Sequence, residues 1–155
     1  MADTAVSLTI DRPPADVWSV LADFGRIARW APNVDHSCVT TQRAEGVGAV
    51  RRIQTGRNTV LETVTYWEPD RRLSYTISGL PSVIRSVTNT WQLDARGGST
   101  DVTLTSSVDA GPRPPQQLVA RIVTRVLAKA SRQMLAGLEH HLAVRDDQVE
   151  QAVSA

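Results

Sequence analysis

Hydrophobic positions recur with a helical period in one long segment, Pro115 to Val144. Apolar residues return there at steps of three and four, at Val119, Ile122, Val123, Val126, Ala130 and Met134. A basic column falls on roughly the opposite side, at Arg121, Arg125, Lys129 and Arg132. Pro114 and Pro115 suit a helix start, because the first N–H groups of a helix have no intrahelical partner. About 30 residues at ~1.5 Å each predict a rod of roughly 45 Å, whose apolar stripe needs a broad cover.

The N-terminal segment predicts one strand and two short helices. Apolar and polar residues alternate from Ala5 to Ile10, which is typical of a half-buried strand. Pro13 and Pro14 mark the start of a short helix with apolar residues Val17, Trp18, Val20 and Leu21. We expect Asp23 to cap a second short helix, which Pro32 ends. The apolar residues of this second helix are Phe24, Ile27 and Trp30.

Strand patterns and turn signals alternate from Val34 to Val108, without a sustained helical period. Three turns set the strand pairing: Thr55 to Asn58, Glu68 to Arg71, and Arg96 to Ser99. Cross-strand partners share a face of the sheet, and a slip of one residue would move a whole set to the other face. The predicted partners are Arg51 with Glu62, Ile53 with Val60, Glu62 with Ile77, Val64 with Tyr75, Val87 with Val108, Asn89 with Ser106, Trp91 with Leu104, and Leu93 with Val102.

This order of elements predicts an α+β fold. A curved antiparallel sheet of about seven strands would wrap around the C-terminal helix, with two short helices after the first strand. Such a sheet encloses more space than one helix fills, so we expect a cavity lined by the inward strand face. One domain is expected over residues 1–144. The segment from Arg145 to Ala155 loses periodicity and is expected to be a disordered tail.

Composition narrows the class of partner. The 155 residues carry a net charge of +1, which gives no argument for nucleic acid as a partner. The N-terminus lacks a signal-peptide pattern, and no apolar run approaches the ~18 residues that span a bilayer, so a cytoplasmic location is expected. Cys38 is the only cysteine, so no internal disulfide forms. Without a cluster of metal-ligating residues or a phosphate-binding glycine loop, we expect no metal and no cofactor.

Five segments in a fixed order carry a resemblance to a known family. They are SLTIDRPPADVWSVLADFGRIARWAP, GVGAVRR, LETVTYWEPDRRLSYTI, WQLDARGGSTDVTLTSSVD and the long helix. From about Thr4 to Leu142, the chain resembles bacterial single-domain members of the START / Bet v 1-like superfamily (SRPBCC), the polyketide cyclase/dehydrase and lipid transport family. The resemblance implies a helix-grip fold with a deep cavity. It also implies binding of lipids, sterols, plant hormones or polyketides, with cyclase or dehydratase activity in a minority of members.

The resemblance also indicates candidate site residues. His36 follows the WAP segment, Arg51 ends the GxGxxR pattern, and Glu62 lies in the LE strand. Positions that relatives use on later strands and on the helix match Tyr75, Asn89, Trp91, Leu104, Ser106, Met134, Gly137 and His141. The hairpin pairing adds Ile53, Val64 and Ile77 to the expected cavity wall.

The pair of Arg51 and Glu62 is the sharpest candidate, because pairing and resemblance both place it on the inward face. A buried ion pair is costly unless it is well hydrogen-bonded. Either it orients a polar ligand group or a bound water, or it is a structural salt bridge at the cavity floor. His36 is either an acid/base near a ligand carbonyl or a histidine at the rim, and His141 is best explained as a core histidine. Cys38 with His36 as a nucleophile pair is weaker, since no oxyanion donor is evident.

Three functions stay open. The first is binding of a small hydrophobic molecule, of lipid, polyketide or aromatic type, by a monomer or homodimer. The alternative is a polyketide cyclase or dehydratase, in which Arg51 stabilises an enolate or phenolate oxygen and His36 or Glu62 moves the proton. The third is a module that binds another protein. The basic column of the long helix is either a solvated face or a contact for acidic lipid headgroups, although four charges are few for the latter.

Overall fold

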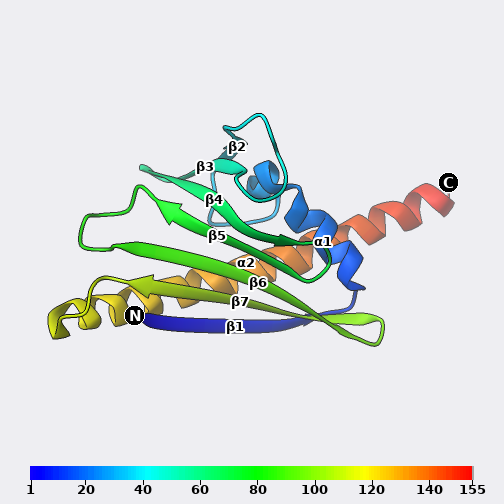
Figure 1. Cartoon of the computed structure of the whole chain (residues 1–155). Coiled ribbons are helices and arrows are strands. Elements are labelled where there is room, and N and C mark those ends of the chain that lie inside the picture. Colours follow the sequence, from blue (N-terminus) through cyan, green and yellow to red (C-terminus); the bar gives the residue numbers. More distant parts are fainter. Residues whose placement is uncertain (155) are drawn as a thin grey trace.

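Seven antiparallel strands form one sheet, and a long helix lies across one of its faces (Figure 1). The computed structural model describes residues 1–154, apart from the side chain of Asp146. The strands are β1 (Ala2–Ile10), β2 (His36–Val39), β3 (Val50–Thr55), β4 (Asn58–Glu68), β5 (Arg72–Ser78), β6 (Ser86–Arg96) and β7 (Ser99–Asp109). Their order across the sheet is β1-β7-β6-β5-β4-β3-β2, so every neighbouring pair except β1 and β7 is consecutive in the chain. The predicted α+β class and the seven strands are confirmed.

The strand registers follow the predicted turns in the β3–β4 and β6–β7 hairpins, whereas beside the β4–β5 turn Glu68 pairs with Arg72, one residue later than a turn from Glu68 to Arg71 implies. Arg51 pairs with Glu62, Tyr75 with Val64, and Trp91 with Leu104, and the other expected pairs are also present. The one irregularity is a bulge in β4 between Val64 and Tyr66. A bulge adds one residue to a strand and changes which side chains face inward beyond it. As a result Trp67, rather than Tyr66, turns towards the core.

Two short helices connect β1 to β2. They are α1 (Pro14–Ala22) and the 3₁₀ helix η1 (Phe24–Arg29). The expectation that Asp23 caps the second helix is wrong, because its side chain makes no capping hydrogen bond. Asp23 is the only residue between the two helices, and its carboxylate lies 3.8 Å from Arg26 Nη1 instead. The apolar residues Val17, Phe24 and Ile27 are buried as expected.

Helix α2 (Pro114–Ser154) packs on β1 and β7 through a narrow face of mixed residue size. This face consists of Ala120, Thr124, Ser131, Leu135, Leu138 and Leu142. The predicted face is partly wrong, because Ile122 and Val126 are exposed to 54% and 66%. Small side chains such as Ala120 and Ser131 bring the helix backbone close to the sheet. The stripe predicted from periodicity included neither Ala120 nor the polar Thr124 and Ser131, and it therefore lies partly beside the buried one.

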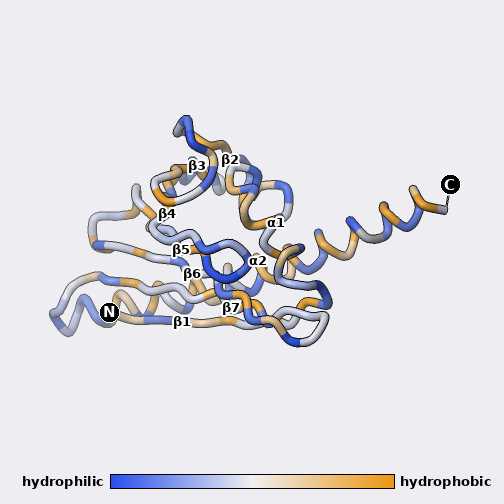
Figure 2. Tube along the Cα trace, turned by 45° about the vertical axis from the view of Figure 1, so that its right-hand side comes forward, coloured by the Kyte–Doolittle hydropathy of each residue, from blue (hydrophilic) through white to orange (hydrophobic). Residues whose placement is uncertain are grey.

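The last turns of α2 extend beyond the sheet (Figures 1 and 2). The expectation of disorder from Arg145 onward is wrong for the backbone, which stays helical to Ser154. The described side chains of residues 143–154 are exposed, as the loss of periodicity indicated. Within residues 1–154, no helix combines the length and the apolar character needed to cross a membrane.

Helix α2 comes very close to the chain that follows η1 at Gly137. A Cβ placed on Gly137 would overlap the carbonyl oxygen of Trp30 and lie 2.7 Å from Pro32 Cδ. Both obstacles belong to constrained backbone or to a proline ring, so they cannot easily move away. The glycine therefore sets the distance between α2 and the segment that carries Trp30.

We expect Gly137→Ala to lower the free energy of unfolding by about 1–3 kcal/mol, the usual cost of overpacking. The sign of the change in the free energy of unfolding distinguishes close packing from an open position, because a glycine-to-alanine change at an open helix position stabilises by ~1 kcal/mol. Urea denaturation checks it. Gly98→Ala, at a turn glycine with no atom within 4 Å of an added Cβ, is the matched control and should change stability little. A Gly137→Ala protein more stable than the parent would contradict the close packing.

Candidate functional site

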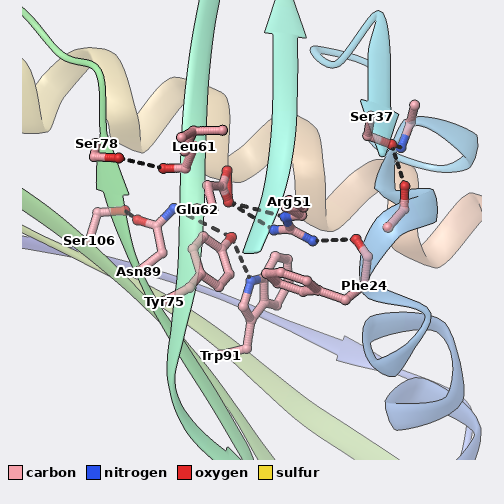
Figure 3. A network of polar contacts seen from close by, with 12 residues as sticks. Phe24, Ser37, Arg51, Leu61, Glu62, Tyr75, Ser78, Asn89, Trp91 and Ser106 are labelled. Carbon is pink, nitrogen blue, oxygen red and sulfur yellow. Dashed lines mark hydrogen bonds and ion pairs between the residues drawn. The ribbon is translucent and has the colours of Figure 1, made fainter. Parts of the chain in front are cut away.

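The inner face of the sheet buries an arginine between two aromatic rings (Figure 3). Arg51 lies on β3, and its guanidinium carbon is 3.8 Å from the centroid of the Phe24 ring and 4.7 Å from that of Tyr75. Both distances are typical of cation–π contacts. The carbonyl oxygen of Phe24 accepts a hydrogen bond of 3.0 Å from Arg51 Nη1. Arg51 thereby links η1 to the sheet.

Glu62 on β4 neutralises the charge of Arg51. Arg51 Nη2 and Nε donate to the same carboxylate oxygen, Oε2, at 2.9 and 3.3 Å. The two side chains are only 3% and 9% exposed, so this is a buried ion pair. No hydrogen bond reaches the other oxygen, Oε1, from any residue that the structure describes. The geometry gives Arg51 a structural role and leaves Glu62 with an acceptor to spare.

A second set of hydrogen bonds crosses three strands and meets at Tyr75. Trp91 Nε1 and Asn89 Nδ2 donate to Tyr75 Oη at 3.2 and 3.5 Å. Ser106 Oγ in turn donates to Asn89 Oδ1 at 2.7 Å. Burial raises the pKa of Tyr75, and the nearby Glu62 carboxylate raises it further. At neutral pH the phenol therefore keeps its proton, for which the described residues provide no acceptor.

Two unmatched groups thus lie on neighbouring strands of one face. Glu62 Oε1 is an acceptor without a donor, and the Tyr75 hydroxyl is a donor without an acceptor. The Tyr75 hydroxyl is fully enclosed, where an unpaired donor costs about 1–3 kcal/mol. Glu62 keeps 7% of its surface exposed, and its Oε1 is not an enclosed atom, so this oxygen is open to a polar group that enters from outside.

The space around this cluster is filled by protein. Tyr75 and Trp91 are 0% and 1% exposed, and Val64 and Leu104 are equally buried, so no water-sized space adjoins them. Phe24 packs edge-on to Tyr75 at 5.9 Å between centroids, and Trp30 packs edge-on to Trp91 at 5.8 Å. The expected open cavity is therefore wrong at these described residues. The prediction compared the sheet with the long helix alone, whereas Phe24 of η1 and Trp30, directly after η1, fill the space between them.

Glu62, Asn89 and Met134 keep exposures of 7%, 7% and 8%. Ile77, the cross-strand partner of Glu62, is half-buried and contacts both hydrophobic clusters. The half-buried apolar side chains of these clusters include Val60, Leu80, Ile84, Val123 and Leu127. An open hollow of about 230 Å³ is lined in part by Val83, Pro115 and Val119. We call the half-buried row between the β5–β6 loop and Ile77 the path to Glu62.

Most predicted site residues gather on this inner face. Those that face it are Arg51, Ile53, Glu62, Val64, Tyr75, Ile77, Asn89, Trp91, Leu104, Ser106 and Met134. Sequence reasoning placed Phe24 and Trp30 only in a helix core and so missed their contacts with Tyr75 and Trp91. The clustering of three aromatic residues within residues 18–30 was the available signal.

His36 does not belong to the cluster. It is exposed on the edge strand β2, and Cys38 shares that side and is also exposed. The residue between them, Ser37, faces inward opposite Ile53 and donates a hydrogen bond to the Gly25 carbonyl at 2.8 Å. Alternation along a strand therefore excludes His36 from the interior, and its predicted position there is wrong.

His141 lies in a different cleft, between η1 and the second half of α2. Arg29 and Arg145 also line this cleft, which has a volume of about 380 Å³. Burial lowers the pKa of His141, and the two arginines lower it further. Among residues 1–154, no group of three or more His, Cys, Asp or Glu side chains is arranged to hold a metal ion.

Comparison with known proteins identifies the family. Residues 1–143 match the family described as polyketide cyclase / dehydrase and lipid transport. The chain belongs to this family. Its members bind hydrophobic ligands or act as polyketide cyclases. No curated protein matches the sequence.

Solved structures of several family-like folds superpose along most of the chain. A protein from Thermobifida fusca is 25% identical, with a TM-score of 0.78 and coverage of 92% of this chain and 93% of that one. An aromatase/cyclase from a Streptomyces species is 18% identical, with a TM-score of 0.76 and coverage of 93% and 94%. A START superfamily protein from Mycobacterium smegmatis is 11% identical, with a TM-score of 0.73 and coverage of 91% and 97%. The last two likenesses concern the fold alone.

We expect Glu62→Gln to lower the free energy of unfolding by about 3–5 kcal/mol, because it leaves the buried charge of Arg51 uncompensated. Urea denaturation measures the loss. Glu68→Gln is the matched control: Glu68 also pairs with an arginine, Arg71, but at 3.7 Å and on the surface. That change should cost less than about 1 kcal/mol. Equal losses of free energy of unfolding in the two variants would show that the buried ion pair contributes no more to stability than the surface pair.

The raised pKa of Tyr75 also predicts a pH dependence. Above about pH 10 the unfolded chain loses a phenol proton that the folded chain keeps, so the free energy of unfolding falls as pH rises. In a Tyr66→Phe protein Tyr75 is the sole tyrosine, since the chain has only two. Its phenolate absorbance should then appear only well above the ordinary value of 10.0. Ionisation at or below that value would contradict the buried environment.

Proposed function

We propose that this family member binds a small, largely apolar molecule that carries one hydroxyl group. The observation that carries the proposal is the unmatched pair on the inner face, Glu62 Oε1 and the Tyr75 hydroxyl. A ligand hydroxyl would satisfy both at once, because it would donate to the carboxylate and accept from the phenol. Since no water-sized space adjoins Tyr75, the side chains around its hydroxyl must move apart for this contact to form. A carbonyl group satisfies Tyr75 alone.

The apolar part of the ligand would lie along the half-buried path towards the β5–β6 loop. Ile77 contacts both hydrophobic clusters of the protein, so it stands between the outer hollow and the buried polar groups. Binding would separate side chains on this path and replace contacts within the two hydrophobic clusters by contacts with the ligand. The family's general capacity for hydrophobic ligands supports this proposal.

A pair of small probes tests the polar part of the proposal. 1-Naphthol should bind about tenfold more tightly than naphthalene, as expected for one hydrogen bond of ~1.4 kcal/mol. Calorimetry or tryptophan fluorescence measures both affinities. Tyr75→Phe should remove most of the difference between the probes. Tyr66→Phe should keep it, because Tyr66 is partly exposed and bonds to Glu68.

Equal affinities of the wild-type protein for the two probes would reject the hydroxyl preference. Failure of both probes to bind, together with native mass spectra showing no apolar molecule on protein purified from its own host, would reject the binding function itself.

One observation favours a second candidate, a cyclase or dehydratase reaction at the same cluster. A free carboxylate oxygen beside a protonated phenol is a base next to an acid, as proton transfer requires. Arg51 would not stabilise an enolate oxygen in this scheme, since its contacts go to Glu62 and Phe24, and Tyr75 would take that role. Turnover of a poly-β-ketone analogue would support this reaction if Glu62→Gln abolishes it while circular dichroism shows that variant still folded, and if His36→Ala preserves it.

A further inference from the structure

The first half of α2 exposes large apolar side chains on the side away from the sheet. Leu118, Ile122 and Val126 are exposed to 58%, 54% and 66%. They follow one another at steps of four residues and therefore share one side of the helix. Single exposed apolar residues are common, but a column of three on one side of a helix marks an interaction surface.

This column continues onto the β5–β6 loop. Val83, at the tip of the loop, is 61% exposed. Val119 on α2 lines the same open hollow as Val83, and it belongs to the same hydrophobic cluster as Leu80. Figure 1 shows the loop and the start of α2 at the same end of the sheet. We call this surface the apolar rim, made of Leu80, Val83, Leu118, Val119, Ile122 and Val126.

The charged residues of the β5–β6 loop and of α2 as far as Arg132 are all basic, although Asp109 at the end of β7 lies beside the hollow. The sequence between Asp109 and Glu139 contains five basic residues and no acidic one, and the β5–β6 loop adds Arg85. These six residues are Arg85, Arg113, Arg121, Arg125, Lys129 and Arg132, and all are exposed. None of them forms an ion pair with a described residue. Since the whole chain carries a net charge of only +1, the rest of the molecule is net acidic.

The basic and apolar columns lie side by side on α2. Arg121 precedes Ile122, and Arg125 precedes Val126, so each basic residue is about 100° around the helix from its apolar neighbour. Helices that lie in a membrane interface have this arrangement. Their apolar side chains enter the boundary of the acyl chains, while long basic side chains reach the lipid phosphates.

Charge decides between the possible occupants of the rim. A second copy of the chain would bring two sets of six positive charges together, which is repulsive. The surface of an anionic bilayer offers both an apolar boundary and negative phosphates, and a basic residue near it gains about 1 kcal/mol. We propose that the apolar rim and its six basic residues dock the protein onto an anionic lipid membrane.

Docking would place the path to Glu62 against the bilayer, because the half-buried residues of that path border the rim. The apolar ligand would then pass between membrane and protein interior without crossing water. This second step rests on the proposed function, whereas the docking itself rests only on the exposed surface.

Sedimentation with vesicles tests the docking. The full chain should bind vesicles of equal phosphatidylglycerol and phosphatidylcholine at low salt, less so at high salt, and hardly at all vesicles of phosphatidylcholine alone. Ile122→Asn/Val126→Asn and Arg121→Gln/Arg125→Gln should each weaken binding at least tenfold. All four positions are exposed, so the fold should survive, which circular dichroism verifies.

Matched controls come from the opposite end of the sheet. Val47→Asn replaces an apolar residue that is 58% exposed, and Arg71→Gln/Arg96→Gln removes two arginines that are 75% and 71% exposed. Both controls should bind vesicles like the wild type. Wild-type binding by the two rim variants, or a similar loss in the controls, would overturn the proposal.

Other outcomes would also overturn docking. If the protein ignores anionic vesicles but self-associates through the rim, or binds an acidic protein there, the rim is a protein interface. The 1-naphthol measurement, made without lipid, separates the two proposals: naphthol binding without vesicle binding rejects the docking and leaves the ligand site intact.

Discussion

The buried charge of Arg51 is the constraint on which the interior depends. A guanidinium group taken out of water must be compensated on every side, and here Glu62, the Phe24 carbonyl and two aromatic faces do so. These partners come from β4, β5 and η1, so one side chain fixes the position of a 3₁₀ helix relative to two strands. The same arrangement holds Phe24 over Tyr75 and thereby closes the space between sheet and helix.

The β3–β4 and β6–β7 hairpins were predictable residue by residue for physical reasons, whereas the bulge in β4 was not predicted. Short turns with glycine fix which residues oppose each other, and the two-residue period of a strand then assigns every face, as it did for Glu62 and Trp91. The predicted inward position of His36 was wrong because ten residues without a tight turn separate β2 from β3. Without such a turn, the sequence does not determine which alternate residues of β2 face inward. The cavity was wrongly predicted because Phe24 in η1 and Trp30 directly after it fill the interior, and side-chain volume supplied by a distant segment has no local signature in the strands. The exposed Ile122 shows the same limit, since only the position of the sheet decides which stripe of a helix is covered.

The two ends of the sheet differ in character. At the end of α1 and η1, edge-on contacts of Trp18 with Trp67 and of Trp30 with Trp91 fill the interior. At the end of the β5–β6 loop, apolar side chains are half-buried or exposed and are ringed by basic residues. The family's hydrophobic ligands and the membrane proposed here as their source would both meet the protein at that second end.

The bulge in β4 allows one strand to direct both Glu62 and Trp67 towards the core. A regular strand offers its alternate positions to one side throughout, so Glu62 and Trp67, five residues apart, would face opposite sides. The extra residue after Val64 shifts the phase and lets the same strand place a carboxylate beside Arg51 and an indole beside Trp18. Deleting one residue there would restore regular alternation and force a choice between an ion pair at one end and an aromatic plug at the other.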